Sequence, residues 1–131
     1  MQYLWAYLGA ATAFLVLDMA WLGFLARDFY TRQMGALMAP SVNLPAAIVF
    51  YALYLAGIVF FAIAPALGGA GLTEALLRGA LFGLLCYGTF DLTNLAVIRG
   101  YPARLAIVDM VWGTFLTGAA SGAGFFLTIH L

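Results

Sequence analysis

Four apolar stretches, each long enough to cross a bilayer, account for almost all of this 131-residue chain. They cover about residues 3–26, 44–65, 73–98 and 103–128, and each exceeds the roughly 20 residues with which an α-helix spans ~30 Å of hydrocarbon. Only 8% of the residues are charged, against roughly 25% in soluble domains, which is too few for a water-exposed surface. The sequence therefore predicts an all-α integral membrane protein, a bundle of four transmembrane helices forming one domain over residues 1–131.

Residues at the expected helix ends support these boundaries. Asn43 is placed to cap the second helix, and Pro65 with the glycine-rich run after it is expected to end that helix. Thr73 is expected to cap the third helix. Glu74 and Arg78 then stand four residues apart, in the order that favours an ion pair on a helix.

The arginines predict the orientation of the chain in the membrane. Arg27 and Arg32 lie in the first connection, Arg99 and Arg104 lie in or beside the third, and only Arg78 lies on the opposite side. Because positively charged loops favour the cytoplasm, we expect loops one and three to be cytoplasmic and both termini to lie outside.

Three carboxylates interrupt the apolar stretches, at Asp18, Asp91 and Asp109. At 1.5 Å per residue, their distances from the helix ends place all three roughly 10–14 Å inside the same membrane face, the arginine-rich one. A carboxylate in hydrocarbon is costly unless it is paired, hydrated or protonated, so intramembrane aspartates indicate a functional site. We call these three residues the aspartate layer, and we expect at least one of them to carry a proton near neutral pH.

Polar and aromatic residues are expected to surround the aspartate layer. A tryptophan follows Asp18 and Asp109 at the same helical spacing, and an indole N–H can donate to a neighbouring carboxylate. Other polar side chains share a face with Asp91 or lie at similar depth on the second helix. The predicted ligand- or proton-binding site consists of Asp18, Asp91, Asp109, Asn94, Trp21, Trp112, Tyr87 and Tyr51.

The arginines near the aspartate layer allow two interpretations. Arg27, Arg99 and Arg104 are predicted to bind a phosphate or carboxylate headgroup of a lipid. Alternatively, the site is a polar core in which Asp–Trp, Asp–Tyr and Asp–Arg contacts only hold the helices together. In that case Arg104 pairs with Asp109, and Arg27 or Arg99 touches Asp18 or Asp91.

The connection from Arg27 to Asn43 has the pattern of a short interfacial helix. Tyr30, Met34, Leu37 and Met38 recur at helical spacing, which would place one apolar face in the headgroup zone. Such a helix could cover the aspartate layer as a lid, or serve as an ordinary connector.

Other residues argue against several classes of site. Cys86 and His130 are the single cysteine and histidine, so paired redox centres, bis-histidine haem and histidine-rich metal sites are excluded within one chain. The sequence predicts no metal, no cofactor and no nucleic-acid partner. Rows of small residues, including Gly79, Gly83 and Gly118, allow close helix packing within one protomer, with a homodimer as the alternative.

Three segments carry a resemblance to a known family. The stretch from Tyr87 to Ala96 and the pieces around Asp18 and Asp109 resemble a family of small bacterial four-helix membrane proteins classed as a domain of unknown function. The resemblance covers nearly the whole chain. It implies a multi-pass protein of the bacterial inner membrane with Asp18, Asp91, Asn94, Asp109 and Trp112 at motif positions, and it implies no activity.

We therefore expect a protein that binds or handles a membrane lipid or lipid-like ligand, because the aspartate layer is shallow and flanked by arginines. The alternative is a small proton-linked transporter or channel that uses the same three aspartates. A third hypothesis, acid–base chemistry on an acyl chain or isoprenoid, names no substrate from the sequence.

Overall fold

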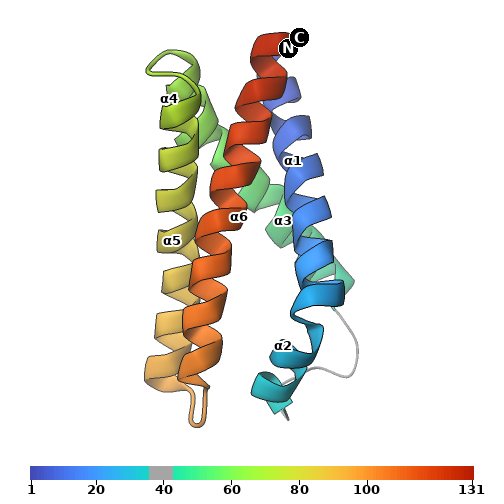
Figure 1. The fold of residues 1–131 in the computed structure, drawn as a ribbon, viewed down its shortest axis with the longest axis vertical. Coiled ribbons are helices and arrows are strands. Elements are labelled where there is room, and N and C mark those ends of the chain that lie inside the picture. The colour runs from blue at the N-terminus through green and yellow to red at the C-terminus, as the bar shows by residue number, and fades with distance from the viewer. Residues whose placement is uncertain (36–42) are drawn as a thin grey trace.

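The computed structural model describes residues 1–35 and 43–131, which form a bundle built on four long apolar helical spans (Figure 1). This confirms the all-α prediction. The elements are α1 (Gln2–Ala20), the π-helical turn η1 (Trp21–Leu25), α2 (Arg27–Met34), α3 (Leu44–Ile58), the π-helical turn η3 (Val59–Ile63), α4 (Ala64–Leu67), α5 (Leu72–Val97) and α6 (Ala103–His130). Both termini lie at one end of the bundle, and α2 and the turn between α5 and α6 lie at the other.

The second span begins as predicted but ends later. The Asn43 side chain accepts a hydrogen bond from the Ala46 amide at 3.2 Å, as an N-cap does. The glycine-rich run ends the helix as predicted, with Gly68 as the C-cap, whereas Pro65 itself lies inside the span, which continues to Leu67. Pro65 lies in the first turn of α4, directly after η3, where the wider turn accommodates a residue that has no backbone N–H to donate.

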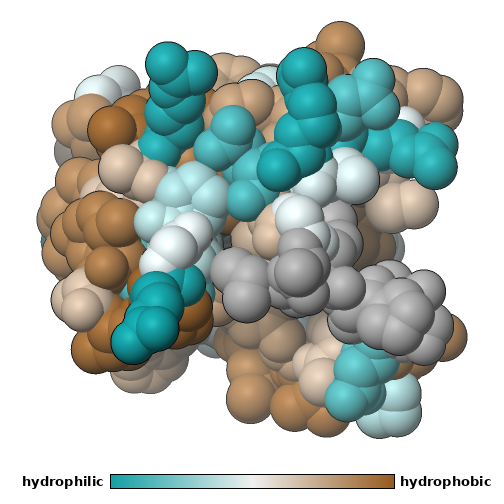
Figure 2. All heavy atoms as spheres, turned by 90° about the horizontal axis from the view of Figure 1, so that it is seen from below, coloured by the Kyte–Doolittle hydropathy of each residue, from teal (hydrophilic) through white to brown (hydrophobic). Residues whose placement is uncertain are grey.

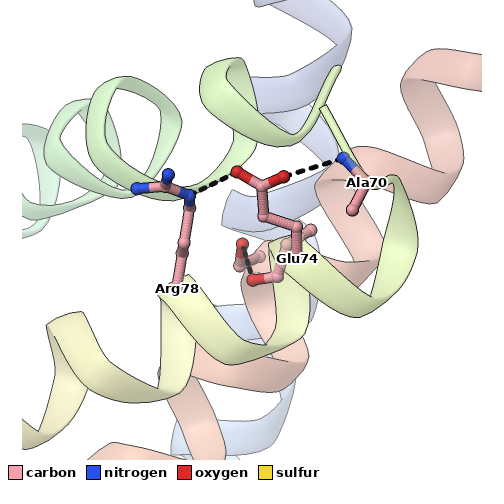
Figure 3. A network of polar contacts seen from close by, with 5 residues as sticks. Ala70, Glu74 and Arg78 are labelled. Carbon is pink, nitrogen blue, oxygen red and sulfur yellow. Dashed lines mark hydrogen bonds and ion pairs between the residues drawn. The ribbon is translucent and has the colours of Figure 1, made fainter. Parts of the chain in front are cut away.

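The third span is capped differently from the prediction. Thr73 lies inside α5, and the N-cap is Gly71, whose φ of 86° is a left-handed conformation that suits glycine. Instead, the Glu74 carboxylate accepts a hydrogen bond from the Ala70 amide at 2.8 Å and pairs with Arg78, as the sequence predicts (Figure 3). This network closes the turn between α4 and α5.

Helix α6 is the centre of the bundle and packs against both α1 and α5. Glycines make both contacts close. A Cβ added to Gly79 would lie 2.8 Å from the Thr117 carbonyl oxygen, and one added to Gly9 would lie 2.9 Å from the Cα of Gly124. The Ser121 hydroxyl, on the same face of α6 as Thr117, donates to the Ala75 carbonyl across the α5 contact at 2.7 Å. Small residues therefore serve packing within one chain, as in other membrane helix pairs.

Helix α3 lies obliquely behind α6 (Figure 1). In Figure 1 it runs from behind α1 towards the upper part of α5, which it reaches through η3 and α4. Tyr54 marks the point of divergence, since its ring stacks on Phe82 of α5 at 5.3 Å. Below that point α3 and α5 separate.

Helix α2 is held against the turn between α5 and α6. Phe29, Tyr30 and Met34 of α2 pack on a small cluster formed by Tyr101, Leu105 and Ala106. The amphipathic pattern of this connection therefore continues as a helix through Met34, and the predicted contributions of Leu37 and Met38 lie outside the described residues. This packing brings Tyr30 towards the aspartate layer.

Candidate functional site

Asp18 is held by two aromatic donors from two other helices. The carboxylate is 7% exposed. The Tyr51 hydroxyl of α3 donates to its Oδ2 at 2.8 Å, and the Trp112 indole of α6 donates to its Oδ1 at 3.3 Å. Both carboxylate oxygens therefore have a partner, and the predicted residues Asp18, Tyr51 and Trp112 come together across three helices.

Asp109 is reached from the peripheral helix α2. The Tyr30 hydroxyl donates to Asp109 Oδ1 at 2.8 Å, and the Trp21 indole donates to the Tyr30 hydroxyl at 3.2 Å. Trp21 and Trp112 stack on each other, with ring centroids 4.4 Å apart and planes 9° from parallel. The two tryptophans thus join the surroundings of Asp18 and Asp109 into one polar network.

Asp91 is the most enclosed member of the aspartate layer. Its side chain is 0% exposed, and Oδ1 accepts a hydrogen bond from the Tyr101 hydroxyl at 3.0 Å. Its Oδ2 has no donor among the described residues. The Asp109 carboxyl lies within hydrogen-bonding reach of Asp91, so a single proton shared by the pair would satisfy the remaining oxygen.

The two tyrosines that serve Asp91 and Asp109 lie outside the four spans and stay protonated. Burial raises the pKa of Tyr101 to about 12, and burial likewise raises the pKa of Tyr30 above its ordinary value. A raised phenol pKa means that each hydroxyl keeps its proton, and its ability to donate, throughout the physiological range.

The arginines do not pair with the aspartates. Within residues 1–35 and 43–131, the one ion pair is that between Glu74 and Arg78. Arg27, Arg99 and Arg104 are exposed at the end of the bundle that Figure 2 views, where hydrophilic side chains gather. The arginine contacts of the polar-core alternative are therefore absent from the described part of the chain, whereas its Asp–Tyr and Asp–Trp contacts are present.

Asn94 and Tyr87 lie beside this network. The Asn94 side chain is close enough to the Tyr101 hydroxyl to interact with it. The Tyr87 ring rests on α6 where Gly113 has no side chain, because a Cβ there would collide with the ring. Tyr87 is also one of the residues that line a cleft.

The cleft lies between helices α3 and α5. Its volume is about 320 Å³, within the range of small-molecule sites. Five of the six lining side chains are aromatic or carry a thiol, and the sixth is a carboxylate. The residues are Phe50, Tyr54, Cys86, Tyr87, Phe90 and Asp109. The aspartate layer therefore opens on an apolar cleft through Asp109.

The arrangement favours proton sharing and hydrogen bonding over metal binding. In the described ranges, no three His, Cys, Asp or Glu side chains gather closely enough to hold a metal ion. Five aromatic donors, Tyr51, Trp112, Tyr30, Trp21 and Tyr101, supply the hydrogen bonds instead.

Sequence reasoning missed Tyr30 and Tyr101 as members of the site. Tyr101 lies in a turn that has no periodicity, and the helical periodicity around Tyr30 placed it in the headgroup zone and not at a particular aspartate. The signal that could have found them is chemical. A carboxylate buried in a membrane needs donors, and these are tyrosines beside the membrane face towards which the aspartates are displaced.

We predict that Tyr51→Phe lowers the free energy of unfolding by about 1–3 kcal/mol, because it leaves a buried carboxylate oxygen without its donor. In an Asp18→Asn background the same substitution should cost clearly less, since the two side chains act as a pair. The measurement is a double-mutant cycle of unfolding in mixed micelles. Tyr3→Phe, at a side chain 55% exposed, is the control. Equal losses in both backgrounds would contradict the assigned hydrogen bond.

Comparison with known proteins identifies the family but no activity. No curated protein and no solved structure matches the chain significantly. A family model described as "Predicted membrane protein (DUF2177)" matches residues 3–126, which include the aspartate layer and the cleft. The chain therefore belongs to the DUF2177 family of multi-pass membrane proteins.

Proposed function

We propose that this protein binds a membrane lipid or a lipid-like molecule in the cleft between α3 and α5, with the aspartate layer meeting the polar end. The observation that carries the proposal is the composition of the cleft, which is aromatic and apolar except where Asp109 enters it. Binding sites for apolar ligands commonly combine such a lining with a few placed polar groups.

The surroundings of the cleft favour access from the bilayer. Phe50 and Phe90, from α3 and α5, are 50% and 57% exposed. On a membrane-spanning bundle such side chains face acyl chains, so an apolar molecule can enter without crossing water. Arg27, Arg99 and Arg104 lie at the same end of the bundle and are proposed to contact anionic headgroups there.

Retained lipid tests this proposal. Cys86→Trp would fill the cleft, whereas Leu85→Trp adds the same bulk at a neighbouring side chain that is 60% exposed to lipid. We expect a lipid species to remain on the purified wild-type protein and on Leu85→Trp, and to fall by about tenfold in Cys86→Trp, as for the loss of ~1.4 kcal/mol of binding energy. Native mass spectrometry of protein released from nanodiscs measures it. Equal retention by all three proteins would refute the cleft as a lipid site.

A second candidate is proton-linked transport, which is favoured by one specific observation. Asp91 Oδ2 is enclosed and has no donor among residues 1–35 and 43–131, and it lies beside Asp109, so this pair is suited to take up and release a proton. The arrangement does not depend on what occupies the cleft.

Reconstituted vesicles separate the two candidates. If the protein moves protons with a solute, a pH gradient should drive acidification reported by a trapped dye, and Asp91→Asn should abolish it because the amide cannot exchange the proton. Thr89→Ala, at an exposed hydroxyl that only bonds its own helix, is the control. Absence of any gradient-dependent signal across tested solutes leaves lipid binding as the surviving candidate.

We also propose that the membrane is the bacterial inner membrane, with α2 and the turn between α5 and α6 facing the cytoplasm. The excess of arginines at this end supports the orientation. A homodimer stays a prediction, and it would use other, lipid-facing surfaces, because the rows of small residues pack within one chain.

Labelling of single cysteines with a membrane-impermeant maleimide tests the orientation in a Cys86→Ser background. Ala70→Cys, in the turn before α5, should react in intact spheroplasts, whereas Thr31→Cys in α2 should react only after permeabilisation. The opposite pattern would reverse the topology, and Cys86→Ser alone provides the unlabelled control.

A further inference from the structure

The cleft between α3 and α5 is lined by two residues whose polar groups are of defined chemistry, Asp109 and Tyr87. The Tyr87 hydroxyl has no hydrogen-bond partner among the described residues and is not buried. The remaining tyrosine of the lining, Tyr54, shares its hydroxyl with Thr117 at 2.7 Å. A ligand in the cleft therefore meets one strong acceptor and one phenol.

The charge around the cleft is negative or neutral. No arginine lines it, and no described arginine pairs with Asp18, Asp91 or Asp109. Asp109 is close enough to Asp18 and Asp91 for their charges to interact. An anionic group brought into the cleft would be repelled by these carboxyls, and in a low-dielectric setting such repulsion is strong.

The hydrogen bond already present makes Asp109 an acceptor. Its Oδ1 accepts from the Tyr30 hydroxyl at 2.8 Å, and a proton held by Asp91 would donate to Asp109 as well. The Asp109 side chain is partly exposed, and it is the group of this network that lines the cleft. A carboxylate that accepts hydrogen bonds from the protein and also lines a cleft is suited to a hydrogen-bond donor on a ligand.

We infer that the cleft selects an apolar, single-chain ligand whose polar end donates a hydrogen bond to Asp109, namely an alcohol or an ammonium, and that it rejects a carboxylate, sulfonate or phosphate end. This inference rests on the proposed lipid-binding function and specifies the ligand class. A hydroxyl donates to Asp109 and accepts from Tyr87, whereas an ammonium donates to the oxygens of both. The anionic headgroups proposed for Arg27, Arg99 and Arg104 belong to the outer surface and not to this cleft.

Three tail-matched photoreactive probes test the inference on the full chain in nanodiscs. They are a dodecyl alcohol, a dodecyl ammonium and a dodecyl sulfonate, each with a diazirine at the same carbon, and the sulfonate stays ionised in the bilayer. Mass spectrometry locates the labelled peptides. We expect the alcohol and the ammonium to label the segments around Phe50 and Phe90 about tenfold more than the sulfonate does.

Two substitutions assign the effect to the polar groups. Asp109→Asn keeps an acceptor for Tyr30 but removes the charge, so ammonium labelling should fall to the sulfonate level while the alcohol loses less. Tyr87→Phe removes only a hydroxyl from a folded cleft, and it should lower alcohol labelling without changing that of the sulfonate. Leu85→Trp, on the lipid-facing side of α5, should leave all three unchanged.

The outcomes separate headgroup selectivity from lipid binding in the cleft. Equal cleft labelling by all three probes would overturn the headgroup selectivity and leave the lipid-binding proposal standing. Cleft labelling by none of the probes, with label only on lipid-facing side chains, would overturn both. Selectivity that survives both Asp109→Asn and Tyr87→Phe would also overturn the inference, because the selecting groups would then lie elsewhere.

Discussion

The close approach of α6 to both α1 and α5 is the contact on which the rest of the structure depends. Glycine at positions such as Gly9, Gly79 and Gly124 removes the side chains that would hold the backbones apart. Since lipid offers no hydrophobic drive for helices to associate, this packing and a few hydrogen bonds hold the bundle together. It also brings Trp112 of α6 within reach of Asp18 of α1, a contact that a wider spacing would break.

The chemistry of the site follows from which side chains donate hydrogen bonds to its carboxylates. Buried carboxylates in proteins are often neutralised by arginine, whereas here aromatic hydroxyls and indoles supply the hydrogen bonds. A neutral donor stabilises an aspartate without cancelling its charge. The aspartate layer therefore keeps a net negative or proton-sharing character, and its electrostatic effect on the cleft is preserved.

Much of the architecture was predictable because hydrocarbon imposes strong and simple rules. Length and hydropathy identified four spans, and counting from the helix ends placed Asp18, Asp91 and Asp109 at one depth, where the structure finds them close together. The continuation past Pro65 was not predictable, because a π-helical turn leaves no mark in composition. Nor was the cleft, which depends on the angle at which α3 crosses the bundle. Tyr101 was missed because a turn residue has no periodicity to place it, and Tyr30 because periodicity placed it on an interfacial helix without showing that it reaches Asp109.

The repeated Asp-Met-x-Trp segments in α1 and α6 acquire a different meaning in three dimensions. Because the two helices are antiparallel, each tryptophan is directed away from the aspartate of its own helix and towards the aspartate of the other helix. Trp112 reaches Asp18 directly, and Trp21 reaches Asp109 through Tyr30. The two connections are related by an approximate two-fold axis, with the stacked indoles at its centre. Only the connection from Trp21 to Asp109 contains an intermediate residue, Tyr30, from outside the membrane spans. The contact between Trp112 and Asp18 is thus fixed by the transmembrane bundle itself, whereas the connection from Trp21 to Asp109 forms only when α2 is docked.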